Sequence, residues 1–89
     1  MNAQDIKNTI RQFIVENFLF GDTSVTFEDN ESLMETGILD STGILELVAF
    51  LEKEFHIRIP NEEILPENMD SLHSLEKFIQ KKLKMNAAS

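Results

Sequence analysis

Apolar residues recur at the three-to-four-residue spacing of a helix in three stretches of the chain. In residues 3–19 the stripe consists of Ile6, Ile10, Phe13, Ile14 and Phe18. The strongest pattern is in residues 41–56, where the stripe is centred on Ile44 and consists of Ile44, Leu47, Val48, Leu51 and Phe55. In residues 71–84 it consists of Leu72, Leu75, Phe78, Ile79 and Leu83. A stripe about 100° wide is what a helix needs to cover one core, so we predict three amphipathic helices.

Polar residues that suit a helix start precede each stripe. Asn2 precedes the first, Asp40 or Ser41 the second, and Asp70 or Ser71 the third. Side-chain oxygens of these residue types accept hydrogen bonds from the free amides of a first helical turn. We therefore expect the three helices to start at these positions.

The connections between these stretches differ in character. Residues 20–39 show no clean periodicity, and so long a loop is unusual in a compact domain. Six apolar side chains can anchor it to the helices, namely Val25, Phe27, Leu33, Met34, Ile38 and Leu39. Residues 57–60 suit an extended link, and residues 61–65 suit one short helical turn with Asn61 as its cap and Pro66 as its end.

These elements fit one small domain. A chain of 89 residues suits a single domain, which at this size buries about 60–65% of the surface that the unfolded chain exposes. We predict an all-α fold over residues 1–89, a small four-helix bundle with three longer helices, one short helix and a long first loop. About residues 3–84 are structured, and residues 85–89 form a frayed tail.

Composition narrows the class of protein. There is no cysteine, which fits a reducing compartment, and no apolar run approaches the ~18 residues that span a bilayer. The stretch Met1–Asp5 has neither the basic nor the apolar region of a signal peptide, so we expect a cytoplasmic protein that does not bind membranes. Two histidines without cysteine do not favour a metal site, and the acidic residues 29–40 lack the glycine of a calcium-binding loop.

The negative charge is concentrated in the middle of the chain. Residues 28–56 hold one basic and eight acidic side chains, a net charge of −7, of the total of −8. Nucleic acid is an unsuitable partner because its phosphates would be repelled. A basic protein surface is the natural counterpart, although the same charge would also serve solubility alone.

One serine lies where the most amphipathic helix begins. If Asp40 caps that helix, the hydroxyl of Ser41 is left free and points outward, near amide hydrogens that suit an attached anion. The simpler interpretation is that Asp-Ser is only a helix cap. A hydrolase that pairs Ser41 with His56 would need a third group and an oxyanion hole, which the sequence does not indicate.

The surroundings of this serine resemble the acyl carrier protein family. The similarity lies in Gly37-x-x-Asp40-Ser41, Glu46-Leu47, Leu51-Glu52-Lys53-Glu54-Phe55, Ile57-x-Ile59-Pro60, Glu62-Glu63 and the final helix. It covers about residues 3–84, with the long first loop in the expected place.

The resemblance implies a carrier that catalyses nothing itself. A phosphopantetheinyl transferase, recognising Asp40 and Ser41, would attach 4′-phosphopantetheine from coenzyme A to Ser41, with magnesium held by the transferase. The arm ends in a thiol, which would carry acyl cargo as a thioester between acyl-transferring, ligase or synthase enzymes of fatty acid, lipid or specialised biosynthesis. The missing cysteine agrees, because no side chain would compete for the acyl group.

The chain departs from the pattern of the fatty acid carriers. Thr42 stands where they usually have a bulky apolar residue, Gly43 where an acidic residue is common, and Ile38-Leu39 replaces a smaller, more polar pair. These departures look more like dedicated carriers, including aminoacyl, peptidyl or D-alanyl carriers. They also leave open an interaction module that keeps the fold and never receives the arm.

Partners should contact the outer face of residues 41–56. The candidates are Thr42, Leu45, Glu46, Ala49, Glu52 and Lys53, a small apolar patch ringed by charges that suits a basic docking surface on a monomeric carrier. Leu45 could instead extend the edge of the core. Phe50 points off the stripe, and either packing under the first loop or lining a cargo cleft would explain it.

Overall fold

The fold is an all-helical bundle, as predicted. The computed structural model describes residues 2–22 and 26–88, with side chains up to Met85. Within these ranges there is no strand, and the elements are α1 (Ala3–Phe18), α2 (Ser41–Phe55), a 3-10 helix (Asn61–Glu63), α3 (Pro66–Met69) and α4 (Leu72–Ala88). No helix in the described part of the chain is long and apolar enough to cross a bilayer.

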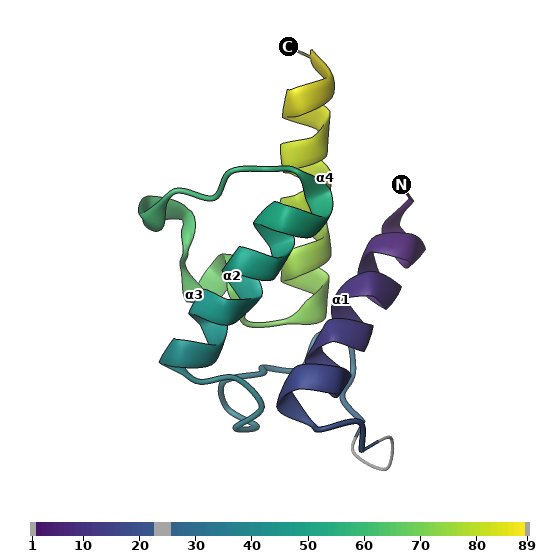
Figure 1. Ribbon diagram of the computed structural model, residues 1–89, viewed down its shortest axis with the longest axis vertical. Coiled ribbons are helices and arrows are strands. Elements are labelled where there is room, and N and C mark those ends of the chain that lie inside the picture. Colours follow the sequence, from purple (N-terminus) through teal and green to yellow (C-terminus); the bar gives the residue numbers. More distant parts are fainter. Residues whose placement is uncertain (1, 23–25, 89) are drawn as a thin grey trace.

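The helices pack so that the long loop lies at one end of the bundle. In Figure 1, α2 and α4 run in the same direction and α1 runs against them, with α3 beside the first half of α2. The segment 26–40 crosses the end at which α1 stops and α2 starts. The most deeply buried side chains come from α1, α2, the loop, α3 and α4, and they are Ile6, Ile10, Ile14, Leu33, Leu39, Leu47, Leu51, Met69, Leu72, Leu75 and Ile79.

The three predicted helix starts are confirmed. Asn2 Oδ1 accepts a hydrogen bond from the Asp5 amide at 2.8 Å, and Asp40 Oδ1 accepts one from the Gly43 amide at 2.7 Å. For the last helix the cap is Ser71, whose Oγ accepts a hydrogen bond from the Ser74 amide at 3.1 Å. Of the paired candidates, Asp40 and Ser71 are therefore the caps, because each side chain reaches the amide three residues ahead.

Two predicted helix ends are wrong. Pro66 does not end the short helical turn; that turn stops at Glu63, and Pro66 is the first residue of α3. Proline suits this position because its missing N–H would have had no partner in the first turn. The prediction that Asn61 caps the short helical turn is also wrong, because Asn61 is its first residue and no side chain in the described part of the chain caps it. The last helix does not stop at residue 84, since it continues to Ala88. Residues 85–88 contain no glycine or proline and two alanines, the best helix former, so nothing local ends the helix there.

The long loop is anchored, as expected, by both apolar and polar contacts. Phe27, Leu33 and Leu39 are buried, while Met34 remains partly exposed and Val25 lies outside the described residues. Asp29 holds the loop to α1 by ion pairs with two basic side chains, Lys7 Nζ at 2.9 Å and Arg11 Nη2 at 2.6 Å. These contacts explain how residues 26–40, which form no regular helix, keep a fixed place in so small a domain.

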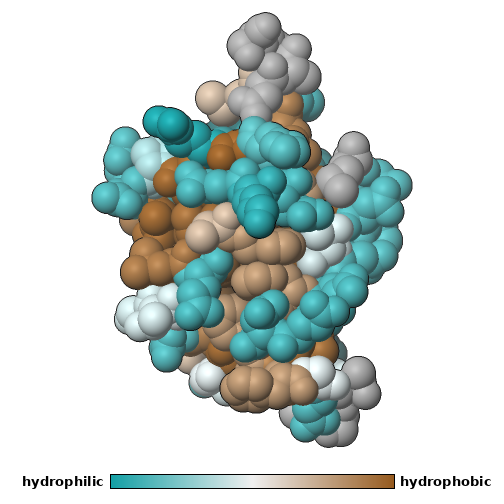
Figure 2. Space-filling model, viewed as in Figure 1, coloured by the Kyte–Doolittle hydropathy of each residue, from teal (hydrophilic) through white to brown (hydrophobic). Residues whose placement is uncertain are grey.

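Phe50 packs against α1. Its ring stacks on that of Phe13, with 4.0 Å between centroids and 16° between planes. Phe18 meets Phe13 edge-on, with centroids 5.8 Å apart. Figure 2 shows apolar side chains gathered over the junction of α2 and α1, and more along the flank beside the α2–α3 connection.

Candidate functional site

Ser41 is the first residue of α2, and its side chain is exposed. Because the Asp40 carboxylate caps the helix, Ser41 is not needed for that role, and its Oγ makes no hydrogen bond with the described residues. The first amides of a helix have no partner within it and lie at the positive end of the helix dipole. The hydroxyl is thus free to react, at a place that favours an attached negative group.

Two glycines shape the chain around this hydroxyl. Gly37 has φ +80°, a conformation that side chains disfavour, and it turns the loop toward the start of α2. Gly43 lies where an added Cβ would be 2.9 Å from Cε1 of Phe18. The glycine in the first turn, unfavourable for a helix by itself, is therefore explained by the close approach of α1.

An apolar groove lies directly beside Ser41. It has a volume of about 280 Å³ and is lined by Met34, Ser41, Ile44, Leu45, Ile64, Leu65, Pro66 and Met69. One wall is α2, another is the loop residue Met34, and the third is the segment from Ile64 to α3. Three exposed apolar side chains, Met34, Leu45 and Leu65, meet here, so this groove is where the bundle leaves apolar surface uncovered next to the free hydroxyl.

Most of this groove does not follow from the sequence patterns. They predict Met34 only as a loop anchor and residues 61–65 only as a helical turn. The available signal was the cluster Ile64-Leu65-Pro66 within an otherwise polar connection. Ile44, predicted as the centre of the buried stripe, is only half-buried, because the elements that cover α2 leave the groove open at its N-terminal end.

The predicted docking residues lie mostly on one exposed surface. Leu45 is 61% exposed and borders the groove, so it does more than extend the core. The other exposed members are Thr42, Glu46, Ala49 and Lys53. Glu52 differs, since it is half-buried and its Oε2 accepts a hydrogen bond from the Ile59 amide at 2.8 Å. That carboxylate holds the α2–α3 connection and is turned away from the outer face.

A catalytic pair of Ser41 with His56 does not form. The two residues stand at opposite ends of α2, and fifteen helical steps of about 1.5 Å separate their backbones by about 22 Å. Among the described residues no three His, Cys, Asp or Glu side chains are grouped as metal ligands would be.

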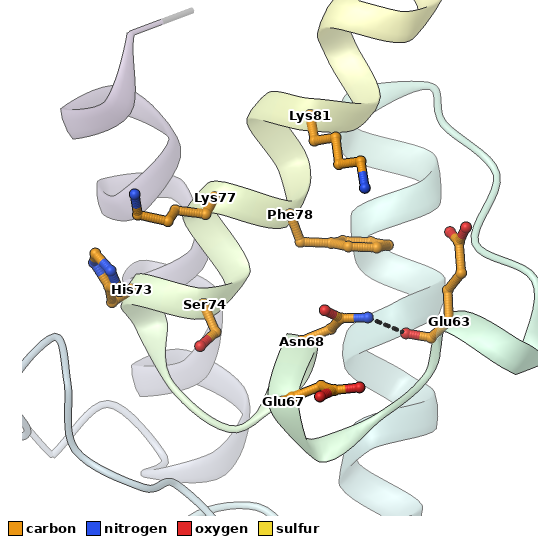
Figure 3. Close-up of a pocket in the computed structure, with 8 residues that line it drawn as sticks. All are labelled: Glu63, Glu67, Asn68, His73, Ser74, Lys77, Phe78 and Lys81. Carbon is orange, nitrogen blue, oxygen red and sulfur yellow. Dashed lines mark hydrogen bonds between the residues drawn. The ribbon is translucent and has the colours of Figure 1, made fainter.

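A larger pocket, of about 360 Å³, lies away from Ser41. Figure 3 shows its lining, in which Phe78 and Lys81 project from α4 toward Glu63, whereas His73 and Lys77 point the other way. Its side chains are largely polar and charged, of both signs. Asn68 Nδ2 donates a hydrogen bond of 2.9 Å to the Glu63 carbonyl, which fixes the turn between them. The same turn contains Ile64, Leu65 and Pro66, which line the groove beside Ser41.

Comparisons with known proteins identify relatives over most of the chain. No family model matches it. The chain is 34% identical over 71 residues to the D-alanyl carrier proteins of two Streptococcus suis strains, 05ZYH33 and 98HAH33, a match that spans 80% of this chain and 86% of each relative. It is 39% identical over 59 residues to the D-alanyl carrier protein of Streptococcus sanguinis strain SK36, spanning 66% of this chain and 71% of that protein. With this similarity and the all-helical fold, the chain belongs to the acyl carrier protein family of phosphopantetheine-dependent carrier proteins.

Proposed function

We propose that this protein carries D-alanine as a thioester on a 4′-phosphopantetheine arm attached to Ser41. The observation that carries the proposal is a free, exposed hydroxyl at the first residue of α2, with the capping role taken by Asp40. On this proposal the chain is a non-catalytic carrier, and Asp40 also belongs to the surface that the phosphopantetheinyl transferase recognises.

The surroundings of Ser41 fit such an arm. Its phosphate would lie by the free amides at the start of α2, where the helix dipole contributes about 0.3–1 kcal/mol. The apolar groove beside Ser41 offers a surface against which part of the arm or its cargo can rest. When bound, the arm supplies a thiol, which this chain lacks because it has no cysteine.

D-alanine is proposed as the cargo because the relatives named above are D-alanyl carriers. None of the three is named for fatty acid or lipid synthesis, so they favour the dedicated-carrier alternative over the fatty acid one. The residues Thr42 and Gly43, which depart from the fatty acid carriers, agree with that choice.

The proposed partners are the transferase and the ligase or transferring enzymes that load and unload the arm. They would approach the exposed face with Thr42, Leu45, Glu46, Ala49 and Lys53. The net charge of −7 over residues 28–56 would attract basic docking surfaces and raise association rates by roughly 10–1000-fold.

The intact mass of the protein tests the attachment. Incubation with coenzyme A, magnesium and a broad-range phosphopantetheinyl transferase should add one arm to the wild type and to Thr42→Ala, and none to Ser41→Ala. An unchanged wild-type mass, or an equal gain for Ser41→Ala, would reject the proposal. The same measurement on protein from its native cells separates a carrier from an unmodified interaction module.

The cargo is tested on the modified protein isolated from its native cells. Mass spectrometry should find an alanyl thioester, released by hydroxylamine, and chiral analysis of the released amino acid should give the D enantiomer. A fatty acyl or L-aminoacyl group on the arm would keep the attachment site and reject D-alanine.

A further inference from the structure

We propose that Asp70 is a positioning residue that holds the loop bearing Met34 closed against the groove beside Ser41. This inference rests on the proposed function only for its consequence, which is protection of the tethered thioester from water. The closure itself is a property of the unmodified protein and can be measured without the arm.

Asp70 binds the loop through both its side chain and its backbone. Ser32 Oγ donates to Asp70 Oδ2 at 2.5 Å, and the Met34 amide donates to Asp70 Oδ1 at 2.9 Å. The Leu33 amide donates to the Asp70 carbonyl at 2.7 Å. Three consecutive loop residues thus bind one residue at the junction of α3 and α4, far away in the sequence.

The position of Asp70 connects two walls of the groove. It directly follows α3, whose Pro66 and Met69 form one wall, and it binds the backbone of Met34, which forms another. Met34 is partly exposed, whereas its neighbour Leu33 is fully buried. Apolar contacts therefore hold Met34 less firmly than they hold Leu33. The hydrogen bonds that Asp70 accepts therefore set how far Met34 stands from the opposite wall.

The size of the effect follows from the number of bonds. Each hydrogen bond that is lost lowers the ratio of closed to open loop by roughly fivefold, so removal of both side-chain bonds raises the open population by roughly 25-fold. The buried Leu33 and its backbone bond to Asp70 remain, which keeps the rest of the loop in place. The expected change is thus local to the groove.

The first test observes the loop in the unmodified protein. Methionine methyl groups labelled with ¹³C report on the groove, because Met34 and Met69 line it while Met85 lies near the far end of α4. In Asp70→Ala, relaxation dispersion of the Met34 methyl should show the raised open population. Asp70→Asn keeps an acceptor for the Met34 amide and has an amide that can donate to Ser32 Oγ, so it should stay close to the wild type.

Asp29→Ala is the matched control. Asp29 holds the same loop, but to α1 and away from the groove, so its loss should leave the Met34 signal unchanged. If Asp70→Ala does not fold, Ser32→Ala removes one of the two bonds to the Asp70 side chain, together with the hydrogen bond that Ser32 Oγ accepts from the Glu35 amide at 3.1 Å. It should raise the open population by at least about fivefold. An unchanged Met34 signal in folded Asp70→Ala or Ser32→Ala, or an equal change in Asp29→Ala, overturns the proposal.

The second test measures the lifetime of the cargo on the modified protein. Water attacks the thioester carbonyl, the C–S bond breaks, and the free acid and the thiol of the arm are released. Asp70→Ala should lose its D-alanyl group faster than wild type, Asp70→Asn and Asp29→Ala. Equal lifetimes would overturn the sheltering role. Failure of Ser41 to take the arm would reject the proposed function and leave the methyl measurement to decide whether the loop is held by Asp70.

Discussion

Replacement of Gly43 by alanine sets helix propensity against packing at the start of α2. Alanine in a helix is favoured over glycine by up to about 1 kcal/mol, so the sequence alone predicts that Gly43→Ala stabilises the protein. In the structure the new Cβ would lie 2.9 Å from Phe18 Cε1, closer than carbon atoms normally approach. Phe18 cannot easily move away, because its ring also packs edge-on against Phe13.

The packing term is the larger of the two. Forcing an extra carbon into a well-packed contact costs about 1–3 kcal/mol, which exceeds the gain in propensity. We expect Gly43→Ala to lower the free energy of unfolding by about 1 kcal/mol, which is about 4–8 °C in Tm for a domain of this size. Leucine at position 18 has no atom equivalent to Cε1, so in a Phe18→Leu background the same substitution should be neutral or stabilising.

Urea unfolding followed by far-UV circular dichroism suits this comparison, because the chain has no tryptophan or tyrosine to serve as a fluorescent reporter. The four proteins of the cycle are the wild type, the two single variants and the double variant. A stabilising effect of Gly43→Ala in the wild-type background would refute the reasoning. So would the same loss in both backgrounds, since Phe18 would then not be its cause.

Two further predictions concern charge. The hydrogen bond from Lys7, together with the charges of Lys7 and Arg11, holds the pKa of Asp29 below its usual 3.8 although desolvation opposes this. A lowered folded-state pKa means that the carboxylate stabilises the protein above pH 3.8 and loses this contribution as the pH falls through the lowered value. The stability difference between wild type and Asp29→Asn, from urea unfolding at several pH values, should therefore be present at neutral pH and shrink below pH 3.8; a constant difference would contradict it. Separately, the KM of the phosphopantetheinyl transferase for this protein should rise with salt and with Glu46→Gln but not with Lys53→Gln, because attraction between exposed charges is screened beyond about 8–10 Å at 0.1–0.15 M salt. A KM that does not respond to salt would show that charge does not guide docking.

The local parts of the fold could be predicted from the sequence. The three long helices and their caps Asn2, Asp40 and Ser71 depend on apolar spacing and on contacts between residues three apart. The exposed position of Ser41 follows from the same local geometry, because only one side chain is needed to cap the helix. Pro66 is ambiguous in the sequence, since proline suits both the end of one helix and the start of the next.

The tertiary structure alone decided what surrounds Ser41. The groove needs α2, the loop at Met34 and the segment before α3 to meet, and Asp70 binds Ser32 across 38 positions of sequence. Helical spacing predicts Glu52 on the outer face, but the hydrogen bond that its carboxylate accepts from the Ile59 amide turns it toward the α2–α3 connection. A helix fixes the relative places of residues three or four apart, whatever the rest of the chain does. Residues tens of positions apart meet only where the packing of whole elements brings them together, and no local pattern encodes that meeting.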